Sequence, residues 1–134
     1  VLRVNGMEVR SEHIFEIKSD VRQEAIIALG KHIASMKKEF SAIFITSDQI
    51  ASYVVQGLVS EGVSVPDEMS VIGFDNLEIC RQISPQLTTI AQDLNQKAFF
   101  AVSTLFQRLS SPSLPAQSMV LDVELVERAS VVQK

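Results

Sequence analysis

The stretch SAIFITSDQIASYVVQGLVSEGVSVPDEMSVIGFDN, residues 41–76, indicates the fold more clearly than any other part of the chain. Residues 42–46 and 69–74 are short apolar runs rich in β-branched and aromatic side chains. Such runs are typical of strands buried on both faces of a parallel sheet. Between them, residues 49–61 carry apolar side chains at helical spacing, and Gly62 is a good stop signal for a helix. This strand–helix–strand order predicts an α/β domain with a parallel sheet.

Upstream of this stretch, the pattern predicts one further strand and one further helix. Residues 14–17 form a short β-type run, and residues 20–38 show a helical period. Ser19 or Asp20 can cap the start of that helix, and residues 46–48 supply the same cap chemistry before the next helix. The apolar face of the first helix is expected to carry Val21, Ala25, Ala28, Leu29, Ile33 and Met36.

Downstream, the pattern predicts an extended segment at 87–90, a long helix and a final strand. Asp93 can cap the helix, which is expected to run from residue 94 to about residue 109. Residues 110–116 are rich in Ser and Pro and indicate a loop, and residues 119–126 alternate apolar and polar side chains as a strand does. The apolar face of the long helix consists of Leu94, Ala98, Ala101, Val102, Leu105 and Leu109, with Phe99 and Phe106 beside it.

Composition and charge favour one ordinary α/β domain. The chain has 134 residues, 46% hydrophobic and 21% charged, which is enough to bury a real core. Its net charge is −4 without a stripe of Lys and Arg, so this segment is not expected to contact DNA by itself. No apolar run is long enough to cross a bilayer and no leader pattern opens the chain, so we expect a cytoplasmic protein with no membrane partner.

Polar pairs follow both strands of the opening stretch. Ser47-Asp48 comes after residues 42–46, and Asp75-Asn76 comes after residues 69–74. Ligands of open α/β sheets bind beyond the carboxyl ends of the strands. A carboxylate there can accept hydrogen bonds from sugar hydroxyls, with Asn or Ser completing the network. Two alternatives remain open: Asp48 caps its helix, and Asp75-Asn76 is turn chemistry.

Signatures of catalysis are weak. His13 and His32 have no Ser or Cys at motif spacing and are expected at the surface, and no Gly-rich phosphate loop occurs. Cys80 is the only cysteine, which excludes an intrachain disulfide and a cysteine metal cluster. Buried packing is its expected role. We therefore expect no enzyme, no cofactor and no metal site.

Four stretches match a known family in order and spacing: 41–51 (SAIFITSDQIA), 61–76 (EGVSVPDEMSVIGFDN), 85–93 (PQLTTIAQD) and 125–130 (LVERAS). Together they resemble the LacI/GalR family of transcription regulators over about residues 41–130. The resemblance implies a parallel-sheet, Rossmann-like lobe of a type I periplasmic-binding-protein-like domain, in truncated form. Residues 1–90 would be mainly the C-terminal lobe, and residues 91–134 would return to the other lobe. The helix-turn-helix head of the family would lie outside this chain.

The resemblance also assigns site residues by position. Asp75 corresponds to the carboxylate that contacts the ligand in the cleft, and Ser47 stands where an Asn often binds the effector. Gln92 lies on the crossover near the cleft. Asp48 matches the neighbouring Asp, for which a structural role is more plausible. Near Val21, where relatives often place a stacking aromatic ring, this chain lacks one, which removes apolar contact with a sugar face.

Family dimers use the outer surface of this lobe, which suggests Tyr53, Gln56, Ile79, Cys80 and Ile83 as interface residues. The alternative is that these side chains pack into their own domain. The long C-terminal helix would lack its usual cover, and an uncovered apolar face of that size predicts self-association.

The function implied by the resemblance is an effector-binding and dimerisation domain of a repressor. The whole protein would sense a small molecule such as a sugar or a nucleoside and would bind operator DNA as a homodimer or higher oligomer. A periplasmic-type solute-binding protein for a sugar is the first alternative, and a small α/β enzyme is the second.

Overall fold

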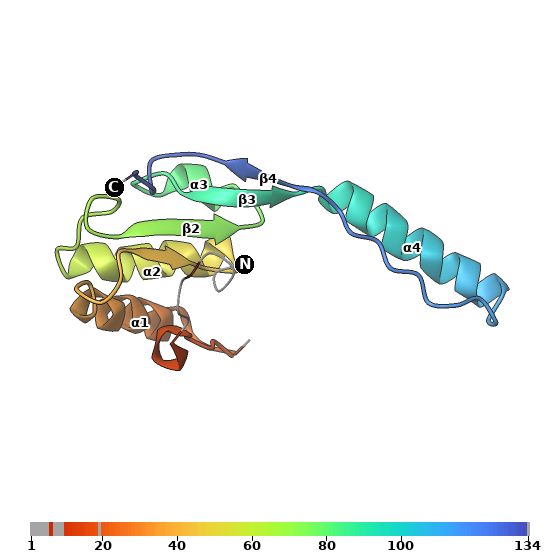
Figure 1. The fold of residues 1–134 in the computed structure, drawn as a ribbon, viewed down its shortest axis with the longest axis horizontal. Helices are drawn as coiled ribbons and strands as arrows, with labels where there is room; N and C mark the ends of the chain where they lie inside the picture. Colours follow the sequence, from red (N-terminus) through yellow and green to blue (C-terminus); the bar gives the residue numbers. More distant parts are fainter. Residues whose placement is uncertain (1–5, 7–9, 19, 134) are drawn as a thin grey trace.

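The computed structural model describes residue 6, residues 10–18 and residues 20–133. Its sheet has four strands in the order β1 (Ala42–Phe44), β2 (Ser70–Phe74), β3 (Thr88–Gln92) and β4 (Val123–Val126) (Figure 1). The first three strands are parallel, and β4 runs antiparallel to β3. The predicted α/β class with a mainly parallel sheet is therefore confirmed.

Four α-helices accompany the sheet in the described part of the chain: α1 (Gln23–Ser35), α2 (Asp48–Ser60), α3 (Ile79–Gln82) and α4 (Leu94–Ser110). A short 3-10 turn, η2 (Ser11–His13), precedes α1. Helix α2 lies between β2 and α1, and α3 also packs against α2 (Figure 1). The core gathers around α2 and includes Ile26, Ile33, Val54, Leu58, Met69, Val71 and Leu87. None of the helices among the described residues is long and apolar enough to span a membrane.

Two glycines let α1 and α2 approach closely. A Cβ on Gly30 would lie 2.5 Å from the carbonyl oxygen of Val54, and a Cβ on Gly57 would collide with the carbonyl oxygen of Ile27. Because α1 contacts α2 through Gly30, the buried face of α1 consists of Gly30, Ile26, Ile33 and Ala34. The predicted face was therefore wrong at Ala25 and Ala28, which are exposed. The hydrophobic period alone does not reveal a contact that depends on the absence of side chains.

Three local predictions differ from the structure. Residues 14–17 form no strand. Strand β1 lies at the edge of the sheet, so Phe44 is 58% exposed instead of buried on both faces. Helix α1 begins at Gln23 with Arg22 as its N-cap, so Asp20 does not cap it, and Ser19 lies outside the described residues.

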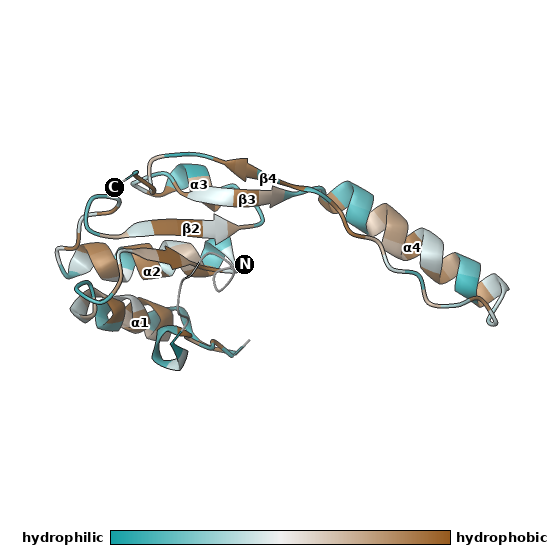
Figure 2. Cartoon of the chain, viewed as in Figure 1, coloured by the Kyte–Doolittle hydropathy of each residue, from teal (hydrophilic) through white to brown (hydrophobic). Residues whose placement is uncertain are grey.

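Strands β3 and β4 extend as a ribbon that carries α4 away from the compact body (Figure 1). Asp93 caps α4 as predicted, since its Oδ1 accepts a hydrogen bond from the backbone N of Gln96 at 2.9 Å. No residue of α4 is buried. Figure 2 shows apolar segments between hydrophilic ones along this projecting helix, where Phe99 is 76% exposed and Leu109 is 68% exposed. The predicted lack of cover on this helix is confirmed.

The end of the chain returns to the compact body after β4, which itself begins at residue 123 and not at the predicted residue 119. Ser130 is fully buried, and its Oγ donates to the carbonyl oxygen of Val71 at 2.6 Å. The same Oγ accepts from the backbone N of Thr88 at 2.8 Å. Ser130 thus bridges β2 and β3, so the end of the chain packs on the compact body.

Candidate functional site

Asp75 lies directly after β2, at the carboxyl end of a central strand. Its φ of 107° lies in the left-handed region, as does the φ of 55° at Asn76, so the predicted turn chemistry is present. The Oδ1 atom accepts a hydrogen bond from Nε2 of Gln92 at 2.6 Å. Oδ2 has no hydrogen-bond partner among the described residues, and the side chain is half-buried. The turn therefore presents one carboxylate oxygen that is open to a ligand.

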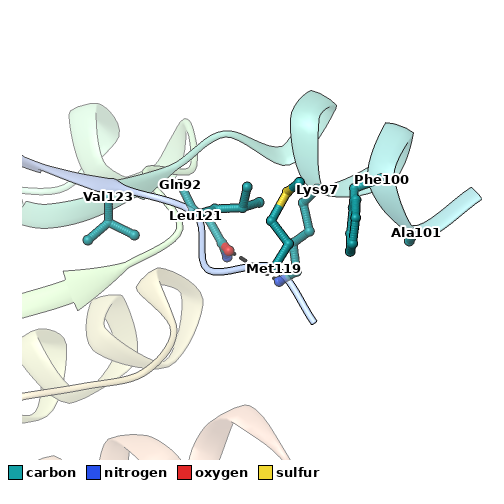
Figure 3. Close-up of a pocket in the computed structure, with 7 residues that line it drawn as sticks. All are labelled: Gln92, Lys97, Phe100, Ala101, Met119, Leu121 and Val123. Atoms are coloured by element: carbon teal, nitrogen blue, oxygen red, sulfur yellow. Dashed lines mark hydrogen bonds between the residues drawn. The ribbon is translucent and has the colours of Figure 1, made fainter. Parts of the chain in front are cut away.

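Gln92 ends β3 beside Asp75, so the structure brings together two of the residues singled out in the sequence. The Oε1 atom of Gln92 accepts a hydrogen bond from Nζ of Lys97, in the first two turns of α4, at 3.1 Å (Figure 3). Sequence reasoning missed Lys97. The sequence feature that could have indicated Lys97 is its position in the first turns after the Asp93 cap, because these turns lie next to the end of β3.

Ser47 lies at the end of β1, on the same edge of the sheet as Asp75. It is the N-cap residue of α2, yet its side chain makes no capping hydrogen bond. Ser47 therefore occupies the predicted N-cap position of α2, but the predicted capping hydrogen bond is not formed. The half-buried hydroxyl remains available for another partner.

Asp48 is fully buried and holds the loop after β2. Its Oδ2 accepts a hydrogen bond from the backbone N of Leu77 at 2.7 Å. Its Oδ1 accepts from Oγ1 of Thr89 at 2.6 Å. The carboxylate does not cap α2, so the capping alternative is wrong. Because one oxygen accepts from the turn and the other from Thr89 of β3, Asp48 stabilises the turn that carries Asp75.

Arg128 also binds the turn that carries Asp75. One guanidinium nitrogen donates to Oδ1 of Asn76 at 2.7 Å, and the other donates to the carbonyl oxygen of Leu87 at 2.7 Å. The segment LVERAS, recognised only as a closing motif, therefore ties the site to the end of the chain.

The surface predicted to form the dimer interface contains a shallow depression. Tyr53, Gln56, Ile79 and Ile83 line a shallow depression of about 540 Å³ between α2 and α3. Cys80 does not belong to it, because its side chain is fully buried in the core. Tyr53 and Ile83 also pack partly against that core, as the packing alternative predicts for these two residues.

Cys80 should be almost inert to thiol reagents in the folded chain. Burial raises the pKa of its thiol from 9.0 to about 12, with further contributions from a hydrogen bond to Asp48 and the charge of that residue. At pH 9 we expect Cys80 to react with a disulfide reagent roughly a thousandfold more slowly in the folded chain than in urea, because only the thiolate reacts. Equal native and unfolded labelling rates would contradict the buried placement.

The thiol of Cys80 stays protonated to a higher pH in the folded chain than in the unfolded chain. Its contribution to the stability of the fold is therefore present below about pH 9 and is lost towards pH 12.

The chain matches the family model described as periplasmic binding protein-like domain over residues 5–131. It is 34% identical over 132 residues to the HTH-type transcriptional repressor PurR of Glaesserella parasuis, covering 94% of this chain and 38% of that protein. It is 35% identical over 91 residues to the ribose operon repressor of Haemophilus influenzae, covering 68% of this chain and 27% of that protein.

Among solved structures, the chain is similar to a LacI family transcriptional regulator from Enterococcus faecalis with bound ribose. The TM-score is 0.71 with 32% identity, and the match covers 86% of this chain and 42% of that one. The chain thus spans well under half the length of each of these three proteins. From the fold, the turn at Asp75 and these matches, the chain belongs to the periplasmic binding protein-like domain family and is part of an effector-binding domain of the LacI/GalR regulator type.

Proposed function

We propose that this chain forms one wall of the effector site in a repressor, and that the effector is a small hydroxylated molecule such as a sugar. One observation carries the proposal: Asp75 is held by Gln92 through one oxygen while its other oxygen stays open at the carboxyl end of β2. An ionised carboxylate is a strong acceptor for hydroxyl groups. The ribose bound to the similar Enterococcus faecalis regulator supports the choice of a sugar.

In this proposal each residue of the site has a separate role. Asp75 accepts a hydrogen bond from a ligand hydroxyl, and Gln92 fixes the carboxylate. Ser47, whose hydroxyl makes no capping bond, contributes a second polar contact from β1. Asp48 acts as a positioning residue through the backbone N of Leu77.

The whole protein would be a cytoplasmic regulator that binds operator DNA through a separate helix-turn-helix region. The net charge of −4 in this segment agrees with a sensing role and not with direct DNA contact. The name of the PurR relative supports the repressor assignment. None of the relatives named above is an enzyme by name, so we propose no catalytic role.

Replacing Asp75 tests the ligand site. In the full-length protein that contains this chain, Asp75→Ala should weaken sugar binding by tenfold or more, because a hydrogen bond to a charged group contributes about 1.5–3 kcal/mol. Isothermal titration with D-ribose and D-glucose measures the dissociation constant. Asp67→Ala, on an exposed turn, is the matched control and should leave the constant unchanged. An unaltered constant for Asp75→Ala would remove this residue from the site.

We also propose that the depression at Tyr53, Gln56, Ile79 and Ile83 belongs to a homodimer interface. Tyr53→Asp places a charge in a surface that would be buried away from water in the dimer. The substitution should raise the dissociation constant of the dimer about tenfold or more. Sedimentation equilibrium of the full-length protein measures this effect. The control is Glu12→Ala in the turn before α1, and a dimer of unchanged strength in Tyr53→Asp would place the interface elsewhere.

A further inference from the structure

Lys97 takes part in a directed chain of hydrogen bonds that ends at Asp75. Its ammonium group donates to Oε1 of Gln92 at 3.1 Å, and Nε2 of Gln92 donates to Oδ1 of Asp75 at 2.6 Å. A glutamine amide has a donor end and an acceptor end. Because the ammonium can only donate, it requires the acceptor end of Gln92 and turns the donor end towards Asp75. Lys97 therefore fixes the orientation of the Gln92 side-chain amide.

The bond to Gln92 uses one of the three donors of the ammonium group. Lys97 is exposed, so its other two donors remain accessible. Its side chain lies in a hollow of about 310 Å³ with Phe100, Met119 and Leu121 (Figure 3). Within the described residues, Lys97 forms no ion pair with Asp75. The site thus presents an open anionic acceptor and an open cationic donor, with the Gln92 amide between them.

We propose that Lys97 is a specificity-determining residue of this site, which selects a ligand with an acceptor oxygen close to the hydroxyl that Asp75 binds. The ligand class is a neutral polyol with neighbouring hydroxyl groups, because each hydroxyl both donates and accepts. The opposite charges of Asp75 and Lys97 leave the site without local net charge, which disfavours strongly anionic and strongly cationic ligands alike. This inference rests on the function proposed above, since it requires that Asp75 binds a ligand hydroxyl.

The test combines a change in the protein with a change in the ligand. Dissociation constants of D-ribose, D-glucose and their monodeoxy analogues are measured by calorimetry for the full-length protein and for Lys97→Met. The unsubstituted protein should bind one parent sugar at least tenfold more tightly than one deoxy analogue, because that analogue lacks the acceptor oxygen. Lys97→Met should lose tenfold or more in affinity for the parent sugar and should bind the two molecules equally.

Two variants serve as controls. Lys97→Arg keeps the charge and the donors and should retain most of the discrimination. Arg108→Met removes the same charge from the last turn of α4, roughly 16 Å along the helix, and should leave every constant unchanged. Equal losses for all sugars in Lys97→Met, or no loss, would overturn the role of Lys97 alone. If neither parent sugar binds the unsubstituted protein, the proposed function and this inference both fail.

Discussion

The 134-residue chain on its own is expected to self-associate at micromolar concentrations, and Phe99→Glu combined with Phe106→Glu should return it to a monomer. These rings are 76% and 63% exposed on α4. A 17-residue helix with no buried residue is marginal in water, because most helix stability in proteins comes from packing. Burying each ring against a second copy is worth about 1.5–3 kcal/mol, so losing both should weaken association a hundredfold or more.

Sedimentation velocity over a dilution series measures the association, and circular dichroism follows helix content in the same samples. Helicity should fall as the chain dissociates, since α4 loses its cover. Ile14→Glu is the control, because Ile14 is 58% exposed on the compact body, away from α4. A monomer of unchanged helicity at high concentration would show that α4 is stable without a partner.

The second large effect is expected for Asp48→Ala, which should lower the free energy of unfolding by about 3 kcal/mol. The substitution leaves the backbone N–H of Leu77 and the hydroxyl of Thr89 without their buried acceptor, at about 1–3 kcal/mol for each group. Urea denaturation of the chain measures the loss. Amide hydrogen exchange at Leu77 should become faster at the same time.

Asp48→Asn separates the hydrogen bonds from the charge. Its carbonyl oxygen can still accept from Leu77, and its amide can donate to the Thr89 oxygen, so about half of the stability should remain. Asp20→Ala, at an exposed position, should change the stability by less than about 0.5 kcal/mol. A loss below about 1 kcal/mol for Asp48→Ala would mean that water replaces the carboxylate.

Much of the fold was predictable because its signals are local. The helix at Asp48–Ser60, the buried strand at Ser70–Phe74 and the Asp93 cap all follow from residues close together in the chain. Sequence pattern failed where a distant contact decided the outcome. The pattern predicted that the strand with Phe44 is buried on both faces and that Ala25 lies on the apolar face of its helix. Both predictions failed because a linear pattern contains neither the strand order nor the close approach of Gly30 to Gly57.

The candidate site likewise contains residues that the sequence indicates and residues whose role only the tertiary structure shows. The sequence pattern identified Asp75 as a polar residue at a strand end, since the ends of parallel strands share one edge of a sheet, and the family resemblance added Gln92. The sequence also indicated the family, through motifs whose order survives in the linear chain. Only the tertiary structure decided that Asp48 is buried behind the turn, that Cys80 lies in the core and that Lys97 reaches Gln92. The partners of Asp48 lie 29 and 41 residues away in the sequence, and Lys97 meets Gln92 across the junction of β3 and α4. Spacing along the chain does not determine such contacts.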